Sequence, residues 1–354
     1  MIILRRYETM KKLLAILLAM LMLMTCAMAE EPTIAKTGEY DASGDPAVEL
    51  LFTSVSVTGD SHTTAMTAFA DAVEELSGGS VICKTYADGT LFSSENEFDA
   101  ISSGQAHLAY ISFPTLATQP GLEWCAMVNS GYFWQSYEHM TSVLNESEVG
   151  EKIWARVTEN TNLVPLGAMY LGARIINTRA KEVHGYADME GLLLRMPGSE
   201  AWQNLGSALG ANPTPLSFSE LYTALSTGAV DAQDNPLPSC ISAKFYEVAP
   251  YFAITNHVVD SIIPCINADT WNALTDAQKQ AVIDAMTYAK AVNDTLRIAS
   301  EAEAIAYLEG EGCTVTYPDV PAYAAEVQAY YTAHPEQTAT WDMDLYNEIQ
   351  ALAK

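Results

Sequence analysis

Two arginines stand at positions where a ligand could reach them. Arg195 lies within the apolar stretch Leu192–Pro197, which predicts a strand, and Arg174 follows the apolar pair Tyr170 and Leu171 and a glycine. The carboxyl ends of parallel strands are where α/β proteins bind ligands, and a planar guanidinium holds a carboxylate through two parallel hydrogen bonds. The alternative is a structural ion pair with one of the chain's 44 acidic residues. The pattern leaves both interpretations open.

The remaining arginines and the aromatic residues are expected to have structural roles. Arg156 and Arg297 lie in predicted helices among polar neighbours, so we expect both side chains to face solvent. Tryptophans usually serve packing rather than ligand binding. We therefore expect packing roles for all six of them: Trp124, Trp134, Trp154, Trp202, Trp271 and Trp341.

The sequence contains no motif for catalysis, metal binding or a cofactor. It has no glycine-rich phosphate loop, no dinucleotide fingerprint after a strand and no nucleophile elbow. The six histidines are far apart, and none belongs to a pair with metal-ligand spacing. The sequence therefore predicts a protein that is not an enzyme and that has neither a cofactor nor a metal site.

Composition limits the class of partner. The 354 residues carry 17 basic and 44 acidic side chains, a formal net charge of −27. Such a surface repels phosphate backbones and anionic lipid headgroups, which disfavours binding to nucleic acid or to a membrane surface. The length suits about two domains. The cysteines are widely spaced without a C-x-x-C motif, so a disulfide scaffold is not expected.

The first 29 residues have the pattern of a signal peptide. Lys11 and Lys12 precede an apolar run from Leu13 to Met24, and Ala27-Met28-Ala29 matches the small-residue form of a cleavage site. We therefore expect export after removal of residues 1–29, to the periplasm or the outer face of the cytoplasmic membrane. The less favoured alternative is a lipid anchor at Cys26. Residues 30–46 are polar, contain glycine and proline, and predict a flexible tether.

Strands and helices alternate along the rest of the chain, which predicts an α/β fold with a largely parallel sheet. Ser94-x-x-Glu97 predicts a capping box at the start of a helix. The ends of two predicted helices, 100–104 and 224–228, resemble each other, which indicates two lobes of like build. A helix without proline or glycine is expected from 276 to about 309, long enough to bridge both lobes.

Several blocks of the sequence resemble the solute-binding proteins of TRAP (tripartite ATP-independent periplasmic) transporters, of the DctP type. The resemblance covers roughly residues 48 to 320, and Leu193, Ala232 and Asp234 depart from the residues usual in that family. The blocks that carry it are Asp188–Pro197, Leu209–Pro215, Phe218–Gly228, Val230–Pro236, Lys244–Val248 and Thr255–His257.

The resemblance implies a periplasmic-binding-protein-like fold of two α/β lobes, joined by hinge strands and a long bridging helix. It implies that lobe I comprises residues 47–171 and 261–300, and that lobe II comprises residues 172–260 and 301–354. It also implies six ligand-binding residues: Arg195 for the ligand carboxylate, Arg174 as a second cationic contact, Asn235 beside the carboxylate, Phe218 as an aromatic lining residue, and Ser112 and Thr115 from the first lobe. Sialic-acid-binding members carry glutamate and arginine at the last two positions, which argues against sialic acid here.

The function that this resemblance implies is capture of a small organic acid, either a sugar acid or a C4-dicarboxylate. The protein, expected to be a monomer, would deliver this ligand to the integral membrane subunits of a TRAP transporter. Two alternatives stay open at this point: an exported enzyme, or a receptor-coupled sensory binding protein, on the same two-lobed scaffold.

Overall fold

Ten strands form a single mixed sheet in the computed structural model, which describes residues 31–353. The strands are β1 (Val48–Thr53), β2 (Val81–Tyr86), β3 (Leu108–Ile111), β4 (Leu163–Pro165), β5 (Met169–Thr178), β6 (Leu193–Met196), β7 (Asn212–Pro215), β8 (Ala232–Pro236), β9 (Tyr251–Asn267) and β10 (Thr314–Thr316). The expected signal peptide and Cys26 lie outside the described residues. All contacts given below are made within residues 34–353.

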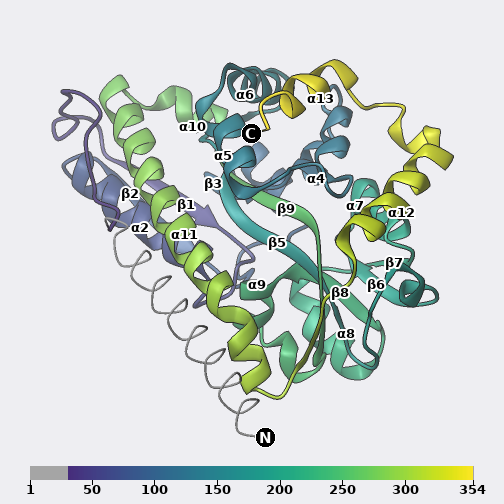
Figure 1. Ribbon diagram of the computed structural model, residues 1–354. Helices are drawn as coiled ribbons and strands as arrows, with labels where there is room; N and C mark the ends of the chain where they lie inside the picture. The colour runs from purple at the N-terminus through teal and green to yellow at the C-terminus, as the bar shows by residue number, and fades with distance from the viewer. Residues whose placement is uncertain (1–30, 354) are drawn as a thin grey trace, which may run out of the picture. The chain divides into compact units, whose positions relative to one another are not determined.

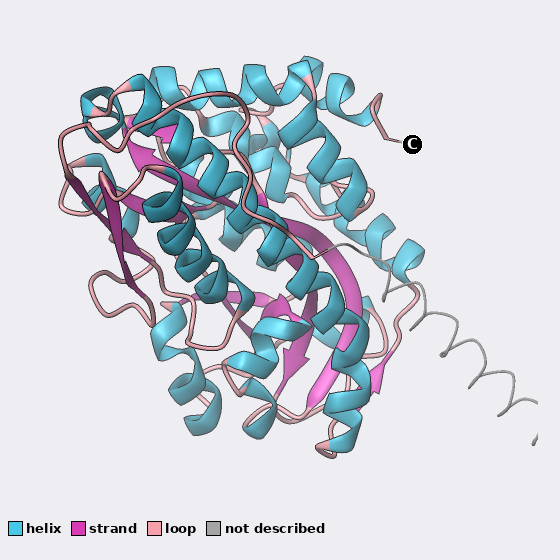
Figure 2. Ribbon diagram, turned by 90° about the vertical axis from the view of Figure 1, so that its left-hand side faces the viewer, coloured by secondary structure: helices cyan, strands magenta, loops and turns pink. Residues whose placement is uncertain are grey.

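Helices cover both faces of this sheet (Figure 2). They are α2 (Ser61–Leu76), α3 (Glu97–Ser102), α4 (Phe113–Leu116), α5 (Tyr137–Glu146), α6 (Glu148–Asn160), α7 (Glu200–Ala208), α8 (Leu221–Thr227), α9 (Leu237–Ser242), α10 (Ala268–Ala273), α11 (Asp276–Gly310), α12 (Val320–Ala333) and α13 (Met343–Gln350). In the part of the chain that the structure describes, none of these is both long and apolar enough to cross a membrane.

Two parallel modules of the same build occupy opposite ends of the sheet. The first module (residues 48–111) has the strand order β2-β1-β3, and the second module (residues 193–236) has the order β7-β6-β8. In each module the helix before the last strand ends at a glycine with positive φ, Gly104 and Gly228. The like build predicted from the two similar helix ends is therefore confirmed.

Between the modules run two antiparallel strands, β5 and β9, which pair with each other. The 17-residue β9 continues past this pair and joins β3 and β4 of one end, so it belongs to both parts of the sheet. The sheet is thus mixed, and not largely parallel as the alternation of elements had indicated. Strand β5 also continues through Gly172, where its register against β9 shifts. Arg174 therefore lies inside a strand, whereas the sequence placed it after one.

The long helix α11 begins at the capping box that Thr275 and Gln278 form, as their spacing predicts. Its first half packs on α2 of the first module, and its second half packs on α9, which follows β8. Figure 1 shows α11 running along one side of the sheet past both modules. The helix thereby connects the two ends of the fold, as expected.

Four apolar clusters supply the core, two at each end of the sheet. One cluster combines β1, α2 and α11, and a second joins α4, α5 and α6. A third cluster combines β6, α7 and α12. The fourth combines α8, α9 and the end of α11. The C-terminal helix α13 adds Leu345 and Ile349 to the cluster around α6. Burial of this apolar surface is the dominant favourable contribution to folding.

Part of the segment 30–46 packs against the fold. The Thr37 amide and the Tyr40 hydroxyl both donate to the Asp284 carboxylate on α11, at 2.9 Å each. Ala42 is fully buried, and Tyr40 packs against the cluster around α2. Composition predicts a flexible tether for this segment, whereas part of it is held by hydrogen bonds to Asp284. Local composition does not indicate these contacts, since Asp284 lies far away in the sequence.

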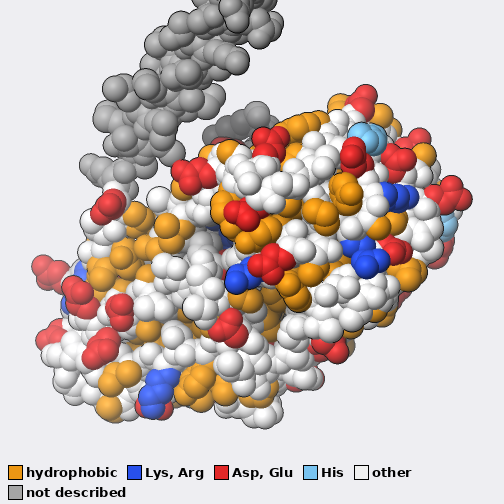
Figure 3. All heavy atoms as spheres, turned by 90° about the horizontal axis from the view of Figure 1, so that it is seen from below, with side chains coloured by type: hydrophobic (Ala, Val, Ile, Leu, Met, Phe, Trp, Pro, Cys, Tyr) orange, Lys and Arg blue, Asp and Glu red, His pale blue; other side chains and the backbone are white. Residues whose placement is uncertain are grey.

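The surface agrees with the acidic composition. Figure 3 shows acidic side chains spread over the face seen there, with fewer basic ones between them. All five cysteines in residues 31–353 are free: Cys83, Cys125, Cys240, Cys265 and Cys313.

Candidate functional site

A cavity of about 490 Å³ lies between the two modules. Its wall comes from the loop after β1, from α3 and the end of β3 on one side, and from β5, β6, the start of α7 and β8 on the other. All six residues that the family resemblance singled out line this one cavity: Ser112, Thr115, Arg174, Arg195, Phe218 and Asn235. Their roles in ligand binding remain predictions.

Arg195 is a buried cation without an acidic partner. It lies in β6, between Thr214 of β7 and Gln233 of β8, and its Nε donates to the Leu216 carbonyl at 2.8 Å. Its side chain is only 2% exposed, and no carboxylate of residues 31–353 lies within ion-pair distance. Burial lowers the pKa of Arg195 to about 10, so it stays protonated at neutral pH. Such a cation favours an anion in the cavity.

The start of α7 strengthens the positive potential beside Arg195. Ser199 is the N-cap residue of this helix, and its Oγ is buried without a hydrogen-bond partner in the described chain. Both Gly198 and Ser199 line the cavity. The N–H groups at a helix N-terminus attract anions. The arrangement suits a carboxylate that contacts the guanidinium and the helix end together.

Arg174 differs, because its charge is already balanced. Its Nε donates to Asp234 at 2.8 Å and its NH1 donates to Asp260 at 3.1 Å, and all three side chains are buried. Its guanidinium also lies over the Trp202 ring, 4.4 Å from the centroid. These two carboxylates raise the pKa of Arg174 despite its burial. The structural ion pair left open by the sequence is therefore present, although Arg174 still lines the cavity.

Asn235 and Phe218 complete the wall near the two arginines. The Asn235 amide nitrogen donates to Gln233 Oε1 at 2.7 Å, and its Oδ1 accepts from Arg174 at 3.4 Å. These bonds fix the orientation of the amide. Phe218 is half-buried and packs edge-on against Phe245 with centroids 5.6 Å apart. One face of the cavity near Arg195 is thus aromatic.

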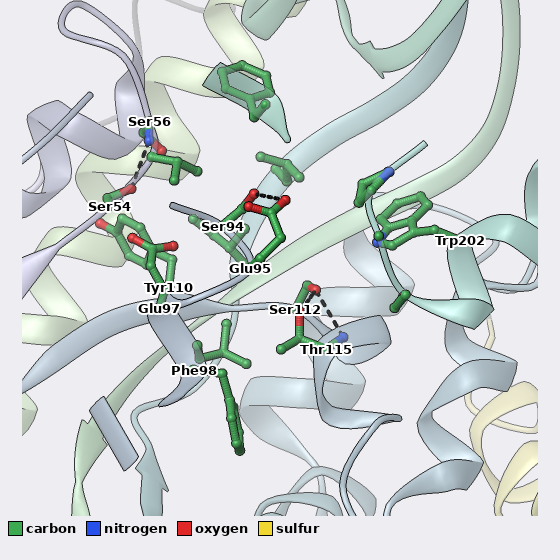
Figure 4. Close-up of a pocket in the computed structure, with 18 of the residues that line it drawn as sticks. Ser54, Ser56, Ser94, Glu95, Glu97, Phe98, Tyr110, Ser112, Thr115 and Trp202 are labelled. Atoms are coloured by element: carbon green, nitrogen blue, oxygen red, sulfur yellow. Dashed lines mark hydrogen bonds between the residues drawn. The ribbon is translucent and has the colours of Figure 1, made fainter. Parts of the chain in front are cut away.

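The opposite wall is rich in hydroxyl groups. Ser112 caps α4, and its hydroxyl lies 2.9 Å from the Thr115 hydroxyl. Ser54 and Tyr110 line the same side of the cavity. Figure 4 shows Trp202 across the cavity from these residues. Hydroxyl groups that both donate and accept hydrogen bonds suit a ligand that carries hydroxyl groups itself.

Sequence reasoning missed one buried acid on this wall. The capping box predicted for Ser94 and Glu97 does not form: Asn96 takes the N-cap position without a side-chain bond, and Ser94 instead donates to Glu95 at 2.8 Å. Glu97 is the first residue of α3, is 5% exposed and lines the cavity. Burial raises the pKa of Glu97 to about 8. No local pattern marks this residue, since its sequence position looks like an ordinary cap.

The expectation that Arg297 faces solvent is wrong. This residue is 1% exposed, and its guanidinium donates to Asp60 at 2.7 Å, at the start of α2. Asp60 also accepts from Ser242, at the end of α9, at 3.0 Å. The ion pair holds the pKa of Asp60 well below its usual range. Arg156, by contrast, is partly exposed and pairs with Asp342 at 2.7 Å.

The family model for bacterial extracellular solute-binding protein, family 7 (DctP) matches residues 52–338. The sialic acid-binding periplasmic protein of Vibrio cholerae is 31% identical over 263 residues, which are 74% of this chain and 80% of that protein. A TRAP periplasmic solute-binding protein from Roseobacter denitrificans, solved with bound 3-deoxy-D-manno-oct-2-ulosonic acid, is 34% identical. Its TM-score is 0.81, and the match covers 87% of this chain and all of that one.

A second solved structure from Roseobacter denitrificans, with bound β-D-glucuronate, is 29% identical at a TM-score of 0.77 and covers 86% of this chain and 99% of that one. These likenesses confirm the two-lobed fold with hinge strands and a bridging helix. They also show a solute-binding protein rather than an enzyme. The chain belongs to extracellular solute-binding family 7, the DctP family of TRAP transporter solute-binding proteins.

Proposed function

We propose that this protein binds a sugar acid in the cavity between its modules and delivers it to the membrane subunits of a TRAP transporter. The observation that carries the proposal is Arg195, a buried guanidinium at a cavity of ligand size, for which residues 31–353 supply no counter-ion. A ligand carboxylate supplies the missing negative charge. In this proposal Arg174 contributes less to binding the carboxylate, because its charge is already paired with Asp234 and Asp260. It serves mainly as a fixed part of the cavity wall.

The carboxylate contact orients the ligand but does not supply all of the affinity. A charge-assisted hydrogen bond contributes about 1.5–3 kcal/mol net, whereas micromolar binding requires about 8.2 kcal/mol. The remainder comes from hydroxyl contacts, from the Phe218 and Trp202 surfaces and from water released on closure. In this proposal lobe I (47–171 and 261–300) and lobe II (172–260 and 301–354) close on the ligand by bending at β5 and β9.

A sugar acid fits the site better than a C4-dicarboxylate. One relative, from Bacillus subtilis, is named a C4-dicarboxylate-binding protein, whereas solved relatives hold glucuronate or an octulosonic acid. In this chain the wall opposite Arg195 carries Glu95 and Glu97 and no free arginine among the described residues. A second ligand carboxylate would find no unpaired cation among the described residues there and would meet the charge of Glu95. Ser112 and Thr115 replace the glutamate and arginine of the sialic-acid binders, which disfavours sialic acid.

The family match favours transport over the two alternatives. The relatives named above are solute-binding proteins by their descriptions. We propose a monomer that is exported by a signal peptide at residues 1–29 and acts in the periplasm. The alternative of a lipid anchor at Cys26 would place the same protein at the outer face of the membrane.

Thermal-shift screening against organic acids tests this proposal, because a ligand that binds only the folded state raises the melting temperature. The panel contains D-galactonate, D-gluconate, D-glucuronate, 3-deoxy-D-manno-oct-2-ulosonic acid, succinate and N-acetylneuraminate. We expect a shift with at least one of the four sugar acids and none with succinate. Arg195→Ala should fold normally and lose the shift. A full ligand response by this variant would contradict the proposal.

A further inference from the structure

Glu97 is a buried acidic residue of the cavity wall that the carboxylate site described above does not use. Its side chain comes from the first turn of α3 in the first module, whereas Arg195 comes from β6 in the second module. Both line the same cavity. Figure 4 shows Glu97 beside Tyr110 and Ser54, on the side of the cavity away from Trp202.

Other buried carboxylates on the wall are paired, and Glu97 is not. Asp60 is paired with Arg297 and Asp260 with Arg174. For Glu97, no ion pair to any residue in 31–353 is present. Its buried Oε1 has no well-formed hydrogen bond within these residues, although the Thr53 hydroxyl lies close enough to lower the pKa of Glu97 against the larger effect of burial. A buried carboxyl without a partner costs free energy, which a group on a bound ligand can recover.

We propose that Glu97 determines specificity by hydrogen bonding to a hydroxyl group of the ligand whose carboxylate Arg195 holds. The ligand class is then a polyhydroxy monocarboxylate with its hydroxyl chain directed toward α3. This inference rests on the proposed function and names the residue that binds the hydroxyl end of the ligand in the same cavity. It also gives a physical reason for a large cavity with a single free cation among its described lining residues.

A hydroxyl group fits this position better than the other two common ligand groups. Burial raises the pKa of Glu97 to about 8, so its carboxyl is neutral at pH 7. A neutral carboxyl both donates and accepts a hydrogen bond, which matches a hydroxyl group. A carboxylate at this end would also meet Glu95, an exposed acidic residue of the same cavity wall. An ammonium group requires Glu97 to ionise in a buried place.

The test compares Glu97→Gln, which keeps a donor and an acceptor, with Glu97→Leu, which keeps neither. The matched control is Glu148→Leu, because Glu148 is also the first residue of a helix but is exposed and outside the cavity. The probe is whichever of D-galactonate, D-gluconate, D-glucuronate and 3-deoxy-D-manno-oct-2-ulosonic acid binds the wild type most tightly. Calorimetry at pH 7 measures the dissociation constant.

We expect Glu97→Leu to weaken binding by about tenfold or more, the cost of an unmade buried hydrogen bond. Glu97→Gln should stay within a few-fold of wild type, and Glu148→Leu should match wild type. Equal binding by wild type and Glu97→Leu overturns the inference and leaves the proposed function intact. If Glu97→Leu fails to fold, Glu97→Ala replaces it under the same expectation.

Two further probes separate this inference from the proposed function. D-Galactarate carries a second, terminal carboxylate in place of the terminal hydroxymethyl group of D-galactonate, and 6-amino-6-deoxy-D-galactonate carries an ammonium group in place of the terminal hydroxyl. Tighter binding of either one by the wild type overturns the hydroxyl assignment to Glu97. Absence of binding by all four monocarboxylate probes contradicts the proposed function itself.

Discussion

Arg174 and Arg195 line the same cavity but differ in charge balance. Arg174 lies between Asp234 and Asp260, at 2.8 Å and 3.1 Å, whereas Arg195 has no carboxylate within ion-pair distance in residues 31–353. The first is part of the scaffold, and the second has its charge available for a ligand. Sequence position alone made the two look equivalent, because each is an arginine close to an apolar strand.

Arg195→Lys is expected to weaken ligand binding by about tenfold or more while the protein stays folded. An ammonium group keeps the charge but cannot make two parallel hydrogen bonds to a carboxylate. Calorimetry with the best sugar acid of the panel measures the change, and circular dichroism checks the fold. Wild-type affinity in the lysine variant would show that charge alone, without the guanidinium geometry, holds the ligand.

Asp234→Asn is expected to lower the free energy of unfolding by about 3–5 kcal/mol, because it leaves Arg174 buried with one acidic partner fewer. His257, which contacts Asp234 at 3.3 Å, loses its charged neighbour as well. Urea unfolding at pH 7 measures the change. The control is Asp71→Asn, which removes an exposed carboxylate from α2 and should change stability little. Similar unfolding curves for both variants would contradict a structural role for the Arg174 pair.

Glu97→Gln is expected to stabilise the protein increasingly as the pH rises from 5 to 8. Burial raises the pKa of Glu97 from 4.5 to about 8 in the folded state. Between these values the unfolded chain is ionised and the folded chain keeps the proton, so wild-type stability falls by up to about 1.4 kcal/mol per pH unit. The glutamine variant lacks this loss. Melting temperatures of both proteins at pH 5, 6, 7 and 8 test the trend, which parallel curves would contradict.

Added salt is expected to speed ligand association. The formal net charge of −27 repels an anionic ligand at long range, and salt screens that repulsion. Stopped-flow fluorescence is a suitable measurement, because Trp202 lines the cavity. The association rate is compared at about 20 and about 200 mM salt, a range over which the screening length changes several-fold. A lower rate at the higher salt concentration would show that attraction by Arg195 outweighs repulsion by the surface charge.

Local sequence patterns predicted those features that depend on neighbouring residues. The capping box at Thr275 and the uninterrupted helix after it are set within a few positions, and both were confirmed. The similar helix ends at Gly104 and Gly228 predicted two lobes of like build, and the structure has two modules with the same strand order. The six residues singled out by family resemblance reach one cavity. Their binding roles stay predictions.

Features that depend on distant partners were missed. Arg297 has polar neighbours in its helix, yet its partner Asp60 lies 237 positions away. The glycine at 172 suggested the end of a strand, but it lies at a register shift with φ of +123°, where a Cβ would come within 2.6 Å of Pro236. Glu97 resembled a capping residue and instead lines the cavity. In each case tertiary contacts overrode a plausible local pattern.

The continuity of β9 limits how this protein can change shape. A single hydrogen-bonded strand of 17 residues pairs with β3 and β4 of the first part of the sheet and with β5, which in turn pairs with β8 of the second module, and no loop interrupts it. Any rotation of one module against the other must therefore bend β9 together with the hydrogen-bonded strands beside it. We therefore expect the two modules to move relative to each other through a limited bend of this strand, and not through free rotation about a flexible loop.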